Sequence, residues 1–209
     1  DEILATDYDK SKVYVTLESK VFGIGVESYT VGSAEFCLSY SDYKGITPLM
    51  DNGHYHPTEV VSDKISSLLL FNEKIALHVT RSVRWDSDHV IRQNDDLRAC
   101  AQEIVKMGPE NFIIALDYFD ASINRVAAWV LGMRNMQKAL LLGLLQPHDT
   151  LKALQDARQY TEQLVLQEEL KSYPWNEVWA EFCRREKKAA DECWMADVLK
   201  YQRDVLSAR

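Results

Sequence analysis

Four acidic or imidazole side chains stand where apolar runs of the sequence end. These residues are Glu18, Asp51, His78 and Asp117, separated by 33, 27 and 39 positions. Carboxylate oxygen and imidazole nitrogen are ligands that divalent cations bind. Each interval suits one strand, one helix and their loops, and the carboxyl ends of parallel strands lie on one face of a sheet. The spacing therefore predicts that the four side chains gather at one site.

Alternation along the strands supports this grouping, because successive side chains point to opposite faces. In the third run, His78 shares its face with Thr80. The candidate ligands oppose the bulky aliphatic side chains, which are Val13, Val15 and Leu17 in the first run, Ile75, Leu77 and Val79 in the third, and Ile114 and Leu116 in the fourth. One polar residue after a strand is most often a loop boundary. Four of matched parity and spacing favour a shared barrel interior or crevice.

The loop after Asp51 adds two imidazoles, His54 and His56, and Gly53 permits a tight turn there. His54 is close enough in sequence to reach the same site. A place in a solvated loop is the alternative for His56. The simpler structural interpretation is preferred for His89 and His148.

The loop after the third run carries the pair Asp86 and Asp88. Two carboxylates two positions apart can bind one hard divalent cation through oxygen, although either residue could instead cap a helix. With Asp51 and His54 in reach, the pair becomes a stronger metal candidate.

Glu18 and Lys20 share one face of the first strand. An ammonium group there can stabilise negative charge on a reacting oxygen. A simple salt bridge to a neighbouring acid explains Lys20 equally well.

Several other kinds of chemistry lack support. The sequence has no G-x-S-x-G elbow and no Walker loop, and Gly23-Ile24-Gly25 lacks the third glycine of a dinucleotide fingerprint. A net charge of −8 without a basic run argues against nucleic-acid binding. The longest apolar stretches, 126–133 and 139–145, fall short of the roughly 18 residues of a membrane span.

The four cysteines are widely spaced and include no Cys-x2-Cys pair. We expect free thiols in a reducing cytoplasm rather than a disulfide framework or a structural zinc site.

The elements that must position these residues alternate between strand and helix. The sequence predicts strands over 12–17, 46–50, 74–80 and 111–116, and helices over 57–71, 95–107 and 121–145. Such alternation indicates βαβ units with a parallel sheet, an α/β fold. Beyond about Pro147 only helices are predicted, over 150–171, 175–187 and 191–207.

Long segments resemble the second half of the bacterial L-rhamnose isomerase family. The matching segments are 18–33, 53–60, 83–90 and 116–125, and the resemblance runs from about Val13 to the end. The family is a (β/α)8 barrel related to xylose isomerase. The resemblance therefore implies the second half of a TIM barrel, with four βα units over 1–146 carrying a dimetal site. It also implies a C-terminal helical extension, 147–209, that takes part in oligomerisation.

The resemblance implies two divalent metal ions, with Mn2+ expected and Zn2+ or Co2+ as alternatives, and no organic cofactor. The ligands of the structural ion would be Glu18, Asp51, His78 and Asp117. Those of the catalytic ion would be His54, Asp86 and Asp88, with Asp51 bridging. Lys20 would hydrogen-bond the substrate oxygen near C1.

The implied reaction interconverts L-rhamnose and L-rhamnulose in L-rhamnose catabolism. Asp86, Asp88 and His54 would hold the water that moves a proton between O1 and O2, while a hydride shifts between C2 and C1. The resemblance also implies a homotetramer for the complete enzyme.

The coverage leaves two alternatives open. Only four βα units are visible, whereas a full barrel needs about 250 residues, and the chain begins at Asp1 without a methionine. We expect a processed chain or a fragment whose partner is a missing N-terminal barrel half. As alternatives, the chain binds metal without turnover, or it is a metal-dependent hydrolase on a similar barrel.

Overall fold

The computed structural model describes residues 1–19, 32–56, 58–83, 88–118 and 122–208. The chain divides into two compact units. The first, called here the sheet unit, comprises Asp1–Ile91 and Met107–Phe119; the second, the helical unit, comprises Arg92–Lys106 and Asp120–Arg209. The expected boundary between a half barrel and an extension, at 146/147, stays a prediction.

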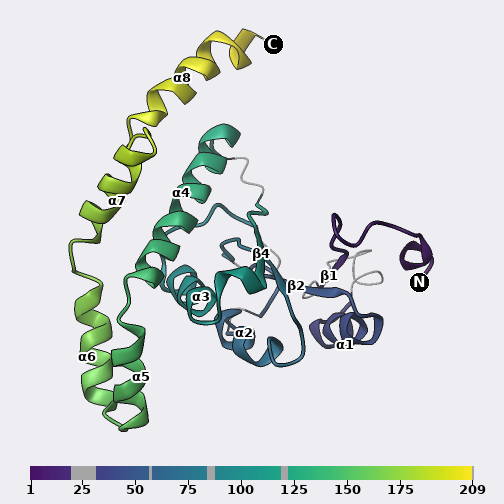
Figure 1. The fold of residues 1–209 in the computed structure, drawn as a ribbon. Helices are drawn as coiled ribbons and strands as arrows, with labels where there is room; N and C mark the ends of the chain where they lie inside the picture. Colours follow the sequence, from purple (N-terminus) through teal and green to yellow (C-terminus); the bar gives the residue numbers. More distant parts are fainter. Residues whose placement is uncertain (20–31, 57, 84–87, 119–121, 209) are drawn as a thin grey trace. The chain divides into compact units, whose positions relative to one another are not determined.

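The sheet unit is built on four parallel strands in the order β1-β2-β3-β4 (Figure 1). Their bounds are β1 Thr16–Glu18, β2 Thr47–Asp51, β3 Ile75–His78 and β4 Phe112–Ala115. Parallel neighbours require a crossover between them, as in βαβ units. The predicted α/β class with a parallel sheet is therefore confirmed, and each strand overlaps its predicted range.

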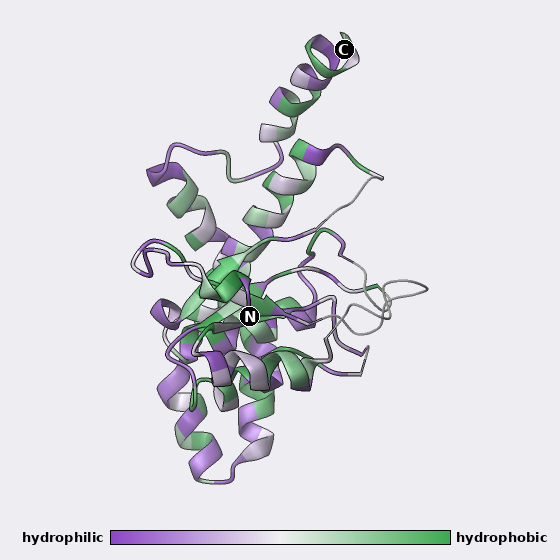
Figure 2. Cartoon of the chain, turned by 90° about the vertical axis from the view of Figure 1, so that its right-hand side faces the viewer, coloured by the Kyte–Doolittle hydropathy of each residue, from purple (hydrophilic) through white to green (hydrophobic). Residues whose placement is uncertain are grey.

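The interior of the sheet unit is aliphatic, and the strands are coloured mainly as hydrophobic in Figure 2. Ile75, Leu77 and Val79 are fully buried, as is Met50 on β2. Burial of each such side chain contributes about 1.5–3 kcal/mol. The face of β3 that was predicted to be aliphatic thus lies in the core.

Among the described residues of the sheet unit, the α-helices are α1 (Ala34–Lys44) and α2 (Ser62–Leu68). Ser33 caps α1 by accepting a hydrogen bond of 3.2 Å from the Phe36 amide, and Gly45 ends it with a φ of 62°. The residue pattern did not predict α1, because the buried residues of this helix are Cys37 and Ser41 rather than large aliphatic side chains.

The predicted helix 57–71 is wrong at its start, since α2 begins only at Ser62. The His56 ring and carbonyl fix the preceding turn: the Thr58 amide donates to His56 Nδ1 at 3.2 Å, and the Glu59 amide donates to the His56 carbonyl at 2.8 Å.

The helical unit contains α3 to α8. Their bounds are α3 Asp95–Lys106, α4 Arg125–Leu144, α5 His148–Asp156, α6 Tyr160–Leu170, α7 Trp175–Arg185 and α8 Trp194–Asp204. α3 packs closely on α4, where a Cβ on Gly143 would lie 3.1 Å from the Ala101 carbonyl oxygen. The single helix predicted over 150–171 is wrong, because Arg158 adopts a φ of 58° and separates α5 from α6.

Arg134 on α4 holds the turn between α7 and α8. Its guanidinium donates to the carbonyls of Ala189 (2.7 Å), Ala190 (2.8 Å) and Asp191 (3.1 Å). The same group lies 5.3 Å from the ring centre of Trp179, whose indole N–H donates to the Ala190 carbonyl at 3.0 Å. One charged side chain thus fixes the entry to α8.

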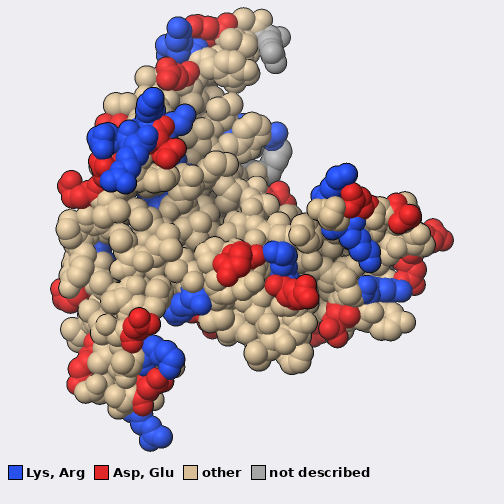
Figure 3. Space-filling view, in the orientation of Figure 1, with Lys and Arg blue, Asp and Glu red and all other residues tan. Residues whose placement is uncertain are grey.

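Positive and negative side chains are intermixed over α7 in Figure 3. On this helix Glu181 forms ion pairs with both Arg184 and Arg185.

Within the described part of the chain, no helix combines the length and apolar character of a membrane span. All four cysteines are free, as predicted, and Cys193 alone among them is exposed.

Candidate metal centre

His78, the last residue of β3, lies among three carboxylates. Its Nδ1 is 2.9 Å from Glu18 Oε1, 3.2 Å from Asp117 Oδ2 and 3.7 Å from Asp51 Oδ2. Glu18 and Asp51 end β1 and β2, and Asp117 follows the end of β4 by two positions. The structure therefore brings together the four residues that the spacing grouped.

Strand register explains this convergence. Asp51 pairs with His78 across β2 and β3, and His78 pairs with Ala115 on β4. Asp117 shares the face of Ala115, because side chains two positions apart point the same way. The ends of neighbouring strands thus present the ligand candidates at one edge of the sheet.

Asp51 is the most buried of these groups, with 1% of its surface exposed. Its Oδ1 accepts hydrogen bonds from the Gly53 amide (2.6 Å) and the Thr80 hydroxyl (2.9 Å). Among the described residues, its Oδ2 has no hydrogen-bond partner. A buried carboxylate oxygen in this condition is costly unless a positive charge compensates it, which fits a bound cation.

His54 is buried beside the same group, with 4% of its surface exposed. Its Nδ1 lies 2.9 Å from the Ser19 carbonyl oxygen, and because a carbonyl only accepts, Nδ1 carries the hydrogen. Nε2 then faces Asp88, 3.5 Å from Oδ1. Of the second predicted ligand group, the structure brings His54 and Asp88 together; Asp86 lies outside the described residues, as does Lys20.

Two sets of side chains could each hold a cation. Within each set, one ligand atom per residue lies within 4.8 Å of the others, and the sets are Glu18, Asp51 and His54, and Asp51, His78 and Asp117. Asp51 belongs to both. Oxygen and imidazole donors in this mixture suit Mn2+, Zn2+ or Co2+, so the donor set fits a divalent metal.

Proton affinities reflect the crowding of negative charge. Burial raises the pKa of Asp51 to about 6. Burial lowers the pKa of His54, but Asp88, Asp51 and Glu18 outweigh it and raise that pKa to about 9. The hydrogen bond that His78 donates to Glu18, followed by the charges of Glu18 and Asp117, raises the pKa of His78 despite burial. The cluster therefore stabilises positive charge, whether on a proton or on a metal ion.

Supporting contacts were not predicted. Thr80 binds Asp51 and the Ser19 carbonyl orients His54. Thr80 lies two positions beyond His78 on the same strand face, which was the one available signal. A backbone carbonyl such as that of Ser19 leaves no trace in residue type.

Neither set includes His56, His89 or His148. His148 Nε2 lies 2.9 Å from the Gly143 carbonyl oxygen, and His89 forms a backbone bridge with Arg81. These placements agree with the structural interpretation preferred for both residues.

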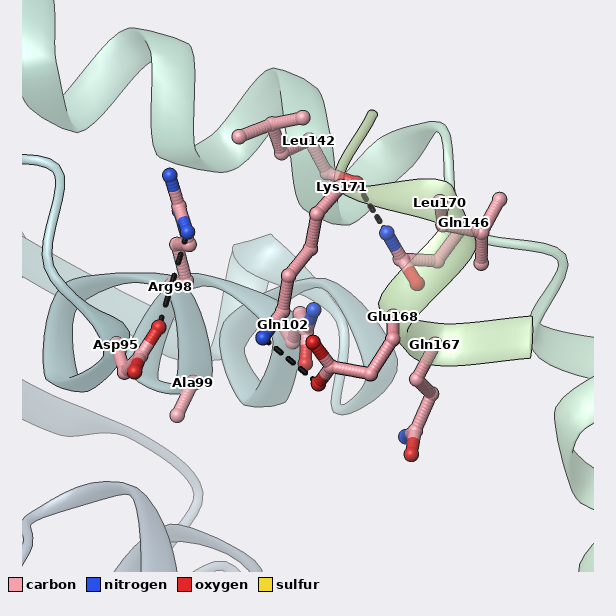
Figure 4. Close-up of a pocket in the computed structure, with 10 residues that line it drawn as sticks. All are labelled: Asp95, Arg98, Ala99, Gln102, Leu142, Gln146, Gln167, Glu168, Leu170 and Lys171. Atoms are coloured by element: carbon pink, nitrogen blue, oxygen red, sulfur yellow. Dashed lines mark hydrogen bonds and ion pairs between the residues drawn. The ribbon is translucent and has the colours of Figure 1, made fainter. Parts of the chain in front are cut away.

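A pocket of about 210 Å³ in the helical unit offers a contrast (Figure 4). Its charged side chains face one another: Lys171 pairs with Glu168 at 2.8 Å, and Arg98 lies 3.7 Å from Asp95. These opposite charges compensate one another, unlike the carboxylates around His78.

Fold and site together define an α/β protein with a candidate divalent-metal centre at the carboxyl edge of a parallel sheet. Comparison with known proteins agrees: the family model for L-rhamnose isomerase (RhaA) matches residues 1–209. The chain is 49% identical to the L-rhamnose isomerase of Pectobacterium atrosepticum, 50% to that of Mannheimia succiniciproducens and 49% to that of Salmonella typhimurium. Each alignment covers 100% of this chain and 50% of the relative.

The chain belongs to the L-rhamnose isomerase family and corresponds to the C-terminal half of its members. The resemblance stated from the sequence is confirmed. The chain spans about half the length of the curated relatives that it matches.

Proposed function

We propose that the complete protein is an L-rhamnose isomerase that interconverts L-rhamnose and L-rhamnulose in L-rhamnose catabolism. The observation that carries this proposal is the family match over residues 1–209, which includes the cluster around His78. The relatives are named isomerases, which favours isomerisation over the hydrolase alternative.

The net reaction moves one hydrogen from C2 to C1 and one proton from O2 to O1, so that the carbonyl passes from C1 to C2. Divalent metal would supply Lewis acidity toward the sugar oxygens. Proposed ligands of the structural ion are Glu18, Asp51, His78 and Asp117. Proposed ligands of the catalytic ion are His54, Asp86 and Asp88, with Asp51 shared.

The chain's own residues would orient and exchange protons. The Ser19 carbonyl keeps hydrogen on His54 Nδ1, so that Nε2 is directed toward Asp88. His54, Asp86 and Asp88 would hold the water through which the proton passes between O2 and O1. Lys20 would hydrogen-bond the sugar oxygen near C1 and stabilise charge there.

The finer assignments extend the same proposal. We expect two Mn2+ ions per site, with Zn2+ or Co2+ as substitutes, in a cytoplasmic homotetramer. Residues 1–146 would form the half barrel that pairs with an N-terminal half, and 147–209 the helical extension used in assembly. The parallel four-stranded sheet is compatible with half of a (β/α)8 barrel.

An assay of L-rhamnose conversion by the complete protein tests the proposal. Activity should be lost with EDTA and return with Mn2+. His54→Asn and Asp88→Asn should reduce kcat by about 100-fold or more, the scale on which acid–base groups contribute. His148→Asn, on a histidine of the helical unit, is the control and should retain activity. Full turnover in the first two variants would contradict the assigned roles, and phosphoester hydrolysis without isomerisation would favour a hydrolase.

The second candidate is a metal-binding fragment without turnover, which the half-length match favours for the isolated 209 residues. Calorimetry with Mn2+ and the same assay distinguish the two. Binding without conversion supports the fragment, whereas full activity of the isolated chain would refute it.

A further inference from the structure

Thr80 belongs to neither candidate ligand set, yet it contacts the residue that both sets share. It follows the end of β3 by two positions and is buried, with 6% of its surface exposed. Its hydroxyl donates a hydrogen bond of 2.9 Å to Asp51 Oδ1. Because Asp51 ends β2, this bond ties the carboxyl ends of two neighbouring strands at the cluster.

The acceptor capacity of Asp51 is divided unequally between its two oxygens. A carboxylate oxygen has two lone-pair positions, and Oδ1 accepts from both the Gly53 amide and Thr80. Oδ2 has no hydrogen-bond partner among the described residues and lies 3.7 Å from His78 Nδ1. A carboxylate turns about its terminal bond with a broad energy profile, so two donors on one oxygen determine which oxygen faces the cluster.

The chain just after Thr80 is held firmly. The Arg81 amide donates to the His89 carbonyl at 3.0 Å, and the His89 amide donates back at 3.3 Å. Arg81 Nε also donates to the Val90 carbonyl at 3.1 Å. The backbone next to Thr80 is therefore fixed by hydrogen bonds, which holds the Thr80 hydroxyl in place as a positioning role requires.

We propose that Thr80 is a positioning residue which, together with the Gly53 amide, engages Asp51 Oδ1 and leaves Oδ2 as the oxygen that binds divalent metal. The inference rests on the proposed function, since it requires a metal site at Asp51. Partners that orient a metal ligand typically contribute about 10- to 100-fold to metal affinity.

The test measures Mn2+ affinity of the complete protein by competition with a chromogenic chelator. Thr80→Val removes the hydroxyl at nearly constant shape and should weaken Mn2+ binding by about 10- to 100-fold. Thr80→Ser keeps the hydroxyl and should bind within a few-fold of the parent. Thr47→Val makes the same change at the opposite end of β2 and is the matched control, with unchanged affinity expected.

Thermal unfolding in EDTA separates positioning from a general loss of structure. The metal-free Thr80→Val protein should unfold close to the parent, and Thr80→Ala replaces it if the valine does not fold. Parental Mn2+ affinity in Thr80→Val (or in Thr80→Ala, where that replaces it) would overturn the role of Thr80 while leaving the metal site intact. Equal losses of affinity in Thr80→Val and Thr80→Ser would do the same. A parent protein that binds no Mn2+ would overturn the site, and with it this role. A Mn2+-bound structure in which Oδ1 contacts the ion would also contradict the proposal.

Discussion

At the scale of single residues, the arrangement around His78 is expensive without a cation. Glu18, Asp51 and Asp117 all approach one imidazole nitrogen within 3.7 Å. The hydrogen bond to Glu18 and the negative charges of Glu18, Asp117 and Asp51 raise the pKa of His78 despite burial. A divalent ion in place of the proton would compensate more of this negative charge and so stabilise the arrangement further.

His78 should contribute directly to metal affinity. His78→Gln removes the imidazole at the centre of the three carboxylates, so Mn2+ binding should weaken by more than the roughly 10- to 100-fold of a supporting partner. Equilibrium dialysis with Mn2+ measures this loss. His148→Gln, whose histidine contacts the Gly143 carbonyl oxygen, is the control; an equal loss in both variants would contradict the assignment.

Metal affinity should rise with pH. Below about pH 6 both Asp51 and His54 hold protons, since their pKa values are about 6 and about 9. A metal ion must displace those protons, so affinity increases as each group loses its proton, by up to about tenfold per pH unit for each proton displaced. Calorimetry in buffers of different ionisation heat counts the released protons. Binding without proton release at pH 7 would refute this competition.

The sequence predicted the candidate ligands but not the groups that orient them. Glu18, Asp51, His78 and Asp117 were predictable because strand spacing and parity act on residues of distinctive chemistry. The contacts of Thr80 and the Ser19 carbonyl were not, because they depend on which backbone atoms the fold brings near Asp51 and His54.

At the scale of elements, the sequence predicted the four strands but not α1, the helix between β1 and β2. β2, β3 and β4 follow apolar runs, whereas α1 buries only Cys37 and Ser41 and so lacks an aliphatic pattern. The separation of α5 from α6 depends on Arg158, whose left-handed backbone conformation cannot be predicted from an arginine in the sequence. The spacing of apolar residues indicates which side chains are buried. It therefore misses α1, which buries few large side chains, and the break between α5 and α6, which depends on backbone conformation.

Arg134 should stabilise the helical unit more than an exposed arginine does. Its three hydrogen bonds to carbonyls of the α7–α8 turn are charge-assisted. Because they share one partly exposed guanidinium, together they should contribute about as much as a single bond to a charged group, roughly 1.5–3 kcal/mol. Arg134→Met should therefore lower the free energy of unfolding by about 2–3 kcal/mol, measured by urea titration. Arg185→Met removes an exposed ion pair with Glu181 and should cost at most about 1 kcal/mol. Equal effects of the two substitutions would argue against the anchoring role.

At the scale of the whole molecule, the four strands found in the described residues form an open sheet with β1 and β4 at its edges. Exposed strand edges favour further pairing, and the chain spans half the length of its relatives. The cluster lies at the carboxyl ends of these strands, where active sites of (β/α)8 barrels are built. Part of the acidic excess behind the net charge of −8 is thereby located in this cluster.

The most direct test of the account is a crystal structure of the complete protein with Mn2+, with anomalous diffraction recorded at the manganese edge. We expect a peak bound by His78 Nδ1 and by oxygens of Glu18, Asp51 and Asp117 at about 2.0–2.3 Å, distances usual for such ligands. A second peak should lie beside His54 and Asp88. Anomalous density elsewhere, with these side chains left as hydrogen-bonded ion pairs, would contradict the central claim that they form a metal centre.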